Sequence, residues 1–111
     1  MLTGQVIAVT GLNATDNPGP GISVIRALRH DPSFRGRIVG LCYDALEPGI
    51  YARDLVDDVF LVPYPSLGSE ELRKRLVYIR DAVGLTTIIP TLDAELPGFI
   101  KLADELGRMG I

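Results

Sequence analysis

Val6-Ile-Ala-Val-Thr10 is an apolar, β-branched run, and Gly11-Leu-Asn-Ala-Thr-Asp-Asn-Pro-Gly-Pro-Gly21 follows it directly. Next comes Ile22-Ser-Val-Ile-Arg-Ala-Leu-Arg29, whose apolar residues recur at helical spacing. A buried strand, a glycine-rich turn and an amphipathic helix in this order are typical of an open α/β sheet that binds a ligand at its edge. The helix start would offer free backbone N–H groups, and these groups together with the helix dipole favour an anion.

Four apolar runs predict strands, and they cover Val6–Thr10, Ile38–Tyr43, Val59–Val62 and Thr87–Pro90. Each run is nearly continuous rather than alternating, which is typical of strands that are covered on both faces. Helical patterns separate most of the runs, and this alternation predicts a parallel sheet with right-handed crossovers. We therefore expect an α/β, Rossmann-like open sheet with helices on both faces and the strand order 3-2-1-4.

The predicted helices have recognisable ends. We expect a helix over Ser69–Val83, with Ser69 as its N-cap and Gly84 at its end. The last helix is expected to begin at Pro97, because proline disfavours a helical conformation in the residue before it. A helix of one or two turns is expected near Ile50–Leu55. The predicted inner face of the last helix comprises Phe99, Ile100, Ala103 and Leu106.

The composition is that of an ordinary globular protein. The 111 residues are enough for one domain, and the net charge of −3 argues against nucleic acid or an acidic membrane surface as a partner. No apolar run reaches the roughly 20 residues of a membrane span, and no basic residue marks the first residues as a signal peptide. The single cysteine, Cys42, excludes an internal disulfide. We therefore expect a cytoplasmic protein.

Polar residues from distant segments are expected to meet at the carboxyl edge of the sheet, where such folds bind ligands. The segments that emerge there are 10–21 after the first strand, Asp44 after the second and 91–95 after the fourth. Gly19 and Gly21 have two interpretations. They could allow a ligand to approach the backbone, or they could serve a helix-entry turn that needs small residues.

The acidic residues at this edge also have two interpretations. Asp44 lies about where a dinucleotide site places an acid for the ribose hydroxyls, although the turn lacks a G-x-G-x-x-G pattern. A turn-forming role for Asp44 is favoured. Asp93 and Glu95 could complement the amino terminus of the last helix, or contact a cationic substrate group or a metal-bound phosphate. His30 has no partner histidine or cysteine, so a metal site is not expected.

Motifs in a fixed order run through nearly the whole chain. They are Val-Thr-Gly…Gly-Pro-Gly-Ile-Ser-Val-Ile-Arg-Ala-Leu, Val39-Gly-Leu-Cys-Tyr-Asp44, Asp58-Val-Phe-Leu-Val-Pro63 and Ile88-Ile-Pro-Thr-Leu-Asp-Ala-Glu-Leu96. This succession resembles the amino-terminal domain of ATP-grasp enzymes, with the nearest likeness to carbamoyl-phosphate-synthase-like and pyrrolysine-biosynthesis-like ligases. The most characteristic stretch is the last of the four.

The resemblance implies that residues 1–111 form a single Rossmann-like pre-ATP-grasp domain, without the domains that clasp ATP and magnesium. Such enzymes activate a carboxylate as an acyl phosphate, which an amine or a similar nucleophile then attacks. The amino-terminal domain forms part of the wall for the acceptor substrate. Carried over to this chain, the resemblance points to Gly11, Gly19, Gly21, Thr91, Asp93 and Glu95.

The resemblance also makes the expected partners explicit. ATP and magnesium would belong to ATP-grasp domains of the same or a partner polypeptide, and the chain alone is expected to bind neither and to be inactive. A further strand would be expected to follow Ile111, and the inserted Asn13–Pro18 enlarges the first turn relative to the family. Two alternatives stay open: a small module that binds NAD or a similar adenosine ligand through Gly19, Gly21 and Asp44, and a non-catalytic domain that forms a homodimer through its sheet edge.

Overall fold

The structure is a computed structural model, and it describes residues 5–12, 20–43 and 55–111. The strands are β1 (Val6–Val9), β2 (Arg37–Cys42), β3 (Asp58–Leu61) and β4 (Thr87–Ile89). The helices are α1 (Pro20–His30), α2 (Ser69–Val83) and α3 (Leu96–Arg108), with short 3-10 turns η2 (Pro65–Leu67) and η3 (Asp93–Glu95). Gly19, Asp44, the insertion Asn13–Pro18 and residues 50–54 of the expected short helix lie outside the described residues.

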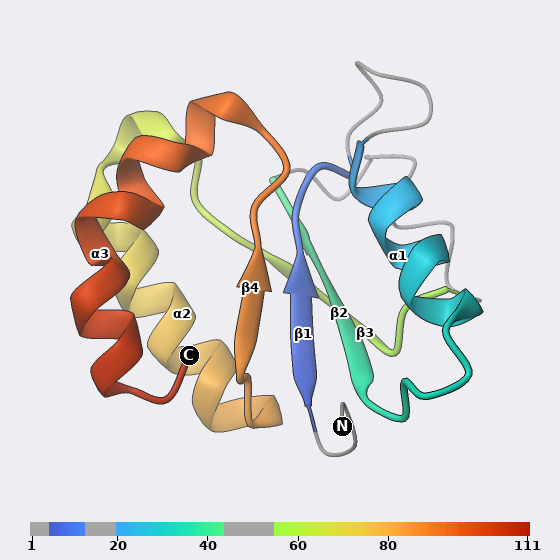
Figure 1. Ribbon diagram of the computed structural model, residues 1–111. Helices are drawn as coiled ribbons and strands as arrows, with labels where there is room; N and C mark the ends of the chain where they lie inside the picture. The colour runs from blue at the N-terminus through green and yellow to red at the C-terminus, as the bar shows by residue number, and fades with distance from the viewer. Residues whose placement is uncertain (1–4, 13–19, 44–54) are drawn as a thin grey trace.

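The described strands form one parallel sheet in the order β3-β2-β1-β4, which confirms the predicted fold and strand order (Figure 1). β1 lies at the centre, where Ile7 is in register with Ile38 of β2 and with Thr87 of β4. The strand ends differ from the prediction by no more than one residue. β1 is buried throughout, whereas β3 and β4 are only partly buried because each has one neighbouring strand.

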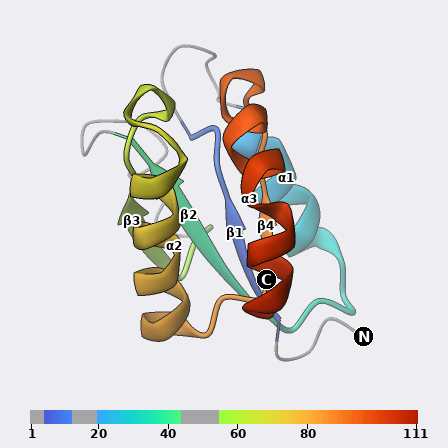
Figure 2. The same ribbon diagram turned by 90° about the vertical axis from the view of Figure 1, so that its left-hand side faces the viewer.

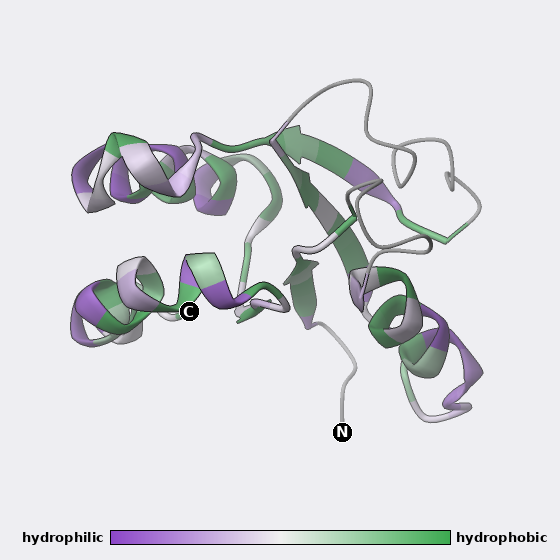
Figure 3. Ribbon diagram, turned by 90° about the horizontal axis from the view of Figure 1, so that it is seen from above, coloured by the Kyte–Doolittle hydropathy of each residue, from purple (hydrophilic) through white to green (hydrophobic). Residues whose placement is uncertain are grey.

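Helices cover both faces of the sheet, as predicted: α1 lies on one face, and α2 and α3 lie together on the other (Figures 1 and 3). Alternate residues of β1 point into two separate cores. Val6 and Ala8 belong to the core beneath α2 and α3. Ile7 and Val9 belong to the core beneath α1. This alternation explains why the central strand reads as one continuous apolar run.

The ends of α2 agree with the predicted bounds but not with the predicted cap. Ser69 is the first helical residue and Gly68 occupies the N-cap position, with no side-chain hydrogen bond, so the assignment of Ser69 as the N-cap was wrong. Gly68 has a positive φ of 92°, and its amide donates to the Pro65 carbonyl at 3.1 Å, so the chain passes directly from the η2 turn into the helix. At the other end Gly84 adopts the left-handed conformation with a φ of 74°, as expected of a glycine that terminates a helix.

The last helix corrects two expectations. It begins at Leu96 rather than Pro97, because η3 already turns the chain and leaves Leu96 with helical backbone angles. The predicted inner face is also wrong in part, since Ile100 is 71% exposed and Ala103 is exposed. Leu102 and Leu106 are the residues of α3 that are buried against the sheet.

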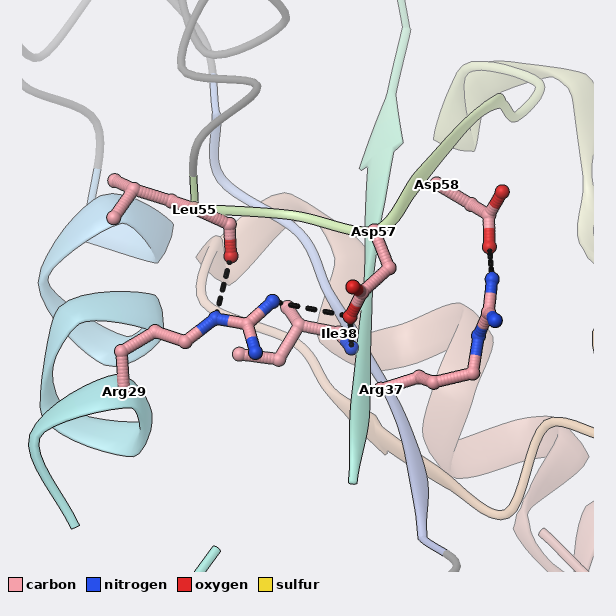
Figure 4. Close-up of polar contacts among 6 residues, drawn as sticks. All are labelled: Arg29, Arg37, Ile38, Leu55, Asp57 and Asp58. Atoms are coloured by element: carbon pink, nitrogen blue, oxygen red, sulfur yellow. Dashed lines mark hydrogen bonds and ion pairs between the residues drawn. The ribbon is translucent and has the colours of Figure 1, made fainter. Parts of the chain in front are cut away.

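Arginines hold the amino ends of β2 and β3 together, at the edge of the sheet opposite the carboxyl ends of the strands (Figure 4). Arg29 donates to the carbonyl of Leu55 at 2.9 Å and to the carboxylate of Asp57 at 3.0 Å, and Arg37 pairs with Asp58. Desolvation opposes ionisation of Asp57. The Ile38 amide at 2.8 Å and the Arg29 guanidinium outweigh it and hold the pKa of Asp57 below its usual range.

Candidate functional site

The carboxyl ends of β1, β2 and β4 carry the candidate site. Thr10 follows β1, Tyr43 follows β2 and Thr91 follows β4 after Pro90. Because the strands are parallel, their carboxyl ends lie at the same edge of the sheet (Figures 1 and 2), and these residues follow them there. The described parts of the predicted segments, residues 10–12, 20–21 and 91–95, therefore lie at one edge of the sheet, whereas Asp44 lies outside the described residues.

Two threonines join the turn after β1 to the turn after β4. The amide of Thr91 donates to Thr10 Oγ1 at 2.8 Å, and Thr91 Oγ1 donates to the Thr10 carbonyl at 3.0 Å. The Thr10 amide in turn donates to the carbonyl of Ile89 at 3.3 Å. Thr10 is 1% exposed, so these bonds are shielded from water. The first glycine turn and the turn after β4 consequently have fixed relative positions.

Glu95 is the buried centre of this polar network, with only 2% of its surface exposed. Its Oε1 accepts hydrogen bonds from Thr10 Oγ1 at 2.6 Å and from the Leu92 amide at 3.3 Å. Its Oε2 accepts a hydrogen bond from the hydroxyl of Tyr43. Three donors from three different segments thus satisfy a carboxylate that makes no salt bridge to a described lysine or arginine. Its position at the amino end of α3 adds a favourable interaction with the helix dipole.

Gly11 and Gly21 lie against this network through their backbones. Gly11 has a φ of 77°, and the Gly21 amide donates to its carbonyl at 3.0 Å. A Cβ at Gly11 would lie 1.8 Å from Thr91 Oγ1, and a Cβ at Gly21 would lie 1.9 Å from the Thr10 carbonyl oxygen. Packing between segments of the protein therefore requires glycine at both positions, which supports the turn interpretation of Gly21.

The other predicted site residues are placed differently. Asp93 is exposed at the start of η3, and its side chain makes no hydrogen bond or ion pair with another described residue. Gly19 and Asp44 lie outside the described residues. Among the predicted residues, the structure therefore brings Gly11, Gly21, Thr91 and Glu95 together and leaves Asp93 on the surface beside them.

Two residues of the network were not singled out from the sequence: Thr10 and Tyr43. Both end an apolar run, which is the only local signal that they carry. The ring of Tyr43 also stacks on Tyr64, with the ring centroids 5.2 Å apart and the planes 14° apart. Tyr43 and Glu95 line a small cavity of about 90 Å³ between the amino ends of α2 and α3, with Phe99 on its wall.

The hydrogen-bond network is suited to fixing the relative positions of the strand ends rather than to transferring protons. Each polar group of the network among Thr10, Thr91, Glu95 and Tyr43 already has a partner within the protein. In the described part of the chain, no group of three potential metal-binding side chains is arranged to hold a metal ion. The same part of the chain contains no helix with the length and apolar character needed to cross a bilayer.

Comparison with models of known protein families and with curated protein sequences finds no match to this chain.

Proposed function

We propose that this chain is the amino-terminal domain of an ATP-grasp ligase that joins a carboxylate to an amine, or of a related carbamoyl-phosphate-type ligase. In this function the carboxyl edge of the sheet forms part of the wall of the acceptor-substrate pocket. ATP and magnesium would be held by an ATP-clasping region of the same or a partner polypeptide. Acyl phosphate formation and its attack by the amine would occur between the two parts. The fully buried Cys42 suits the reducing cytoplasm, where we place the enzyme.

The observation that supports the proposal is that the first glycine turn and the turn after β4 are held together by hydrogen bonds. These are the two segments that the family resemblance assigns to the acceptor wall, and hydrogen bonds from Thr91 to Thr10 join them. A wall whose segments are fixed in advance loses little conformational entropy when a substrate binds. The family resemblance and the hydrogen bonds between these two turns together support the assignment.

The two kinds of predicted site residue would contribute differently to the wall. Gly11, Gly21 and Thr91 would contribute its backbone surface, because their close packing fixes the path of the chain. Glu95 would keep that surface in place rather than contact the substrate, because its carboxylate already accepts hydrogen bonds from Thr10 and other donors. Asp93 is the exposed acid beside the wall, so it is the residue that we expect to contact a substrate group directly.

Calorimetry with Mg-ATP tests the proposal on the purified chain. We expect no binding at micromolar concentrations and no ATP hydrolysis, because the ATP-clasping region lies elsewhere. Ligase or robust ATPase turnover by the chain alone would refute the assignment.

Thermal shifts with NAD, NADP, S-adenosylmethionine and ATP separate the proposal from a nucleotide-binding module. We expect none of the four to raise the melting temperature. A shift with NAD that disappears in Asp44→Ala would overturn the proposal in favour of a dinucleotide site. Sequencing the gene around these codons adds an independent test, because an adjoining region with a glycine-rich lid and paired acids would support the ligase.

A further inference from the structure

Arg75 of α2 is held in a fixed position beside the β3 edge of the sheet. Its Nε donates to the backbone carbonyl of Leu61 at 2.7 Å. Its guanidinium carbon lies 4.8 Å from the centre of the Tyr78 ring and 5.8 Å from the centre of the Phe60 ring. The two rings meet edge to face, with their centres 6.4 Å apart. One hydrogen bond and two aromatic rings therefore fix the plane of this guanidinium.

The terminal nitrogens of Arg75 have no acceptor among the described residues. Three arginines in the described part of the chain are half-buried, and they are Arg73, Arg75 and Arg80. Arg73 pairs with the carboxylate of Glu70, and Arg80 lies 3.0 Å from the carboxylate of Asp81. Arg75 is therefore the one of these three whose Nη1 and Nη2 remain free to donate side by side.

The groove beside Arg75 has a volume of about 340 Å³. Its walls are Pro63, Glu71, Lys74, Arg75 and Tyr78. Lys74 Nζ lies 3.6 Å from the Glu71 carboxylate, and both side chains are exposed. Because the charges of this pair offset each other, the guanidinium gives the groove one uncompensated positive charge. Two N–H donors in a fixed fork, together with that charge, fit the two oxygens of a carboxylate.

We propose that this groove binds a glutamate or aspartate side chain of a different protein, whose carboxylate accepts two parallel hydrogen bonds from Nη1 and Nη2 of Arg75. The ring of Tyr78, which is 56% exposed, would pack against an apolar neighbour of that acid. Arginine and tyrosine are enriched among the residues that contribute most to protein–protein binding. Because the guanidinium is already fixed, little side-chain entropy is lost when the carboxylate binds.

The shape and charge of the groove favour a protein as the source of this carboxylate. Sites for small molecules surround most of the ligand, whereas this groove is open to solvent, so the carboxylate has to belong to a larger surface that excludes water. The net charge of −3 argues against nucleic acid. The Glu71 carboxylate on the groove wall would repel a doubly charged phosphate more strongly than a carboxylate. The inference does not depend on the proposed ligase function.

Amide-detected NMR titrations of the isotopically labelled chain test the inference with two peptides of the same shape. The peptides are acetyl-Ser-Leu-Glu-Leu-Ser-amide and the same sequence with Gln in place of Glu, compared at constant ionic strength. We expect a dissociation constant of roughly 1 mM for the glutamate peptide and roughly 10-fold weaker binding of the glutamine peptide. Equal affinities, or no binding of the glutamate peptide at concentrations up to about 10 mM, would overturn the inference.

Three variants of the chain locate the binding of the glutamate peptide. Arg75→Lys keeps the charge but loses the fork, so it should weaken binding roughly 10-fold. Arg26→Gln is the matched control and should leave the affinity unchanged, because Arg26 is an exposed arginine of α1, on the other face of the sheet. Glu71→Gln removes the repelling carboxylate and should tighten binding roughly 3-fold, a gain that a damaged fold does not produce. Equal weakening by the two arginine variants, or no gain from Glu71→Gln, contradicts the assignment.

The other possible occupants are tested with simpler probes. Sodium acetate and inorganic phosphate should each bind roughly 10-fold more weakly than the glutamate peptide. If either anion binds as tightly as the peptide, the groove is a site for a free anion and the proposal of a protein partner fails. Sedimentation velocity of the chain alone should show no self-association that depends on Arg75. Self-association that is lost in Arg75→Lys would overturn the proposal in favour of a second copy of this chain.

Discussion

Replacing Glu95 with alanine is the sharpest test of how the candidate site is held together. The substitution removes the acceptor for the Thr10 hydroxyl, the Tyr43 hydroxyl and the Leu92 amide at once. Because Thr10 is 1% exposed, its hydroxyl would lose this acceptor without gaining access to bulk water. The turn after β1 and the turn after β4 would keep only their direct threonine bonds.

The expected loss follows from the strength of these bonds. A hydrogen bond to a charged group contributes about 1.5–3 kcal/mol, and the Leu92 bond at 3.3 Å is the weakest of the three. Removing the carboxylate also removes the desolvation cost of a buried charge, which offsets part of the loss. We expect Glu95→Ala to lower the free energy of unfolding by about 3 kcal/mol. Glu95→Gln, which keeps the shape and one oxygen, should cost about 1 kcal/mol.

Urea unfolding followed by circular dichroism measures both variants, because a domain of this size is expected to unfold in two states. Asp93→Ala is the control, since this neighbouring acid is exposed and should cost at most about 1 kcal/mol through the helix dipole. A double-mutant cycle with Thr10→Val isolates the Thr10–Glu95 pair. A Glu95→Ala variant within about 0.5 kcal/mol of the wild type would refute the role given to this carboxylate.

Three further outcomes are expected from urea unfolding. Gly84→Ala should cost about 1 kcal/mol, because the φ of 74° penalises any Cβ even though nothing lies within 4 Å. Gly107→Ala, inside α3 with equally open space, should instead stabilise by up to about 1 kcal/mol, so equal effects would contradict the conformational argument. The pKa of Asp57 is lowered on folding, so its stabilisation is complete above about pH 4 and is lost as the pH falls through the folded pKa. The deficit of Asp57→Asn at pH 7 should therefore shrink at pH 3, and a constant deficit would contradict this.

The sheet was predictable because its signals are local. Each strand appears as a short apolar run, and the alternation with helices leaves few parallel arrangements. Gly84 was predictable in the same way, since a glycine after a periodic segment marks a helix end. The error at Ser69 shows the limit of this approach. Gly68 and Ser69 are adjacent in the sequence, and the path of the chain out of η2, rather than helix-capping propensity, decides which of the two occupies the N-cap position.

The inner face of α3 could not be chosen from the sequence because the helix has two apolar stripes. One contains Leu96, Ile100 and Ala103, and the other contains Phe99, Leu102 and Leu106. Both stripes have helical spacing, so periodicity does not say which one meets the sheet. The packing of α3 decides it: Leu102 and Leu106 of the second stripe are buried against the sheet. The residues of the first stripe are exposed along a groove of about 440 Å³ between β4 and α3.

The burial of Glu95 was beyond sequence reasoning for a different reason. A glutamate at the start of a helix is ordinarily a solvated residue that interacts with the helix dipole. Its principal partners, Thr10 and Tyr43, lie 85 and 52 residues away in the chain. Only the parallel pairing of β2, β1 and β4 brings the three strand ends to one place. Nothing in the local pattern distinguishes this acid from the exposed Asp93.

The atoms beside each glycine decide how the glycine turn is to be interpreted. A glycine kept for a ligand leaves space where its Cβ would be, and the ligand fills that space. At Gly21 the Thr10 carbonyl already fills it, and at Gly11 the Thr91 hydroxyl does. Neither position therefore has the free space that a dinucleotide fingerprint offers to a phosphate, so a substrate of the proposed wall would lie against the outer surface of this packed turn. If the proposed wall binds a substrate, its specificity would depend on exposed groups, and the exposed carboxylate within residues 91–95 is that of Asp93.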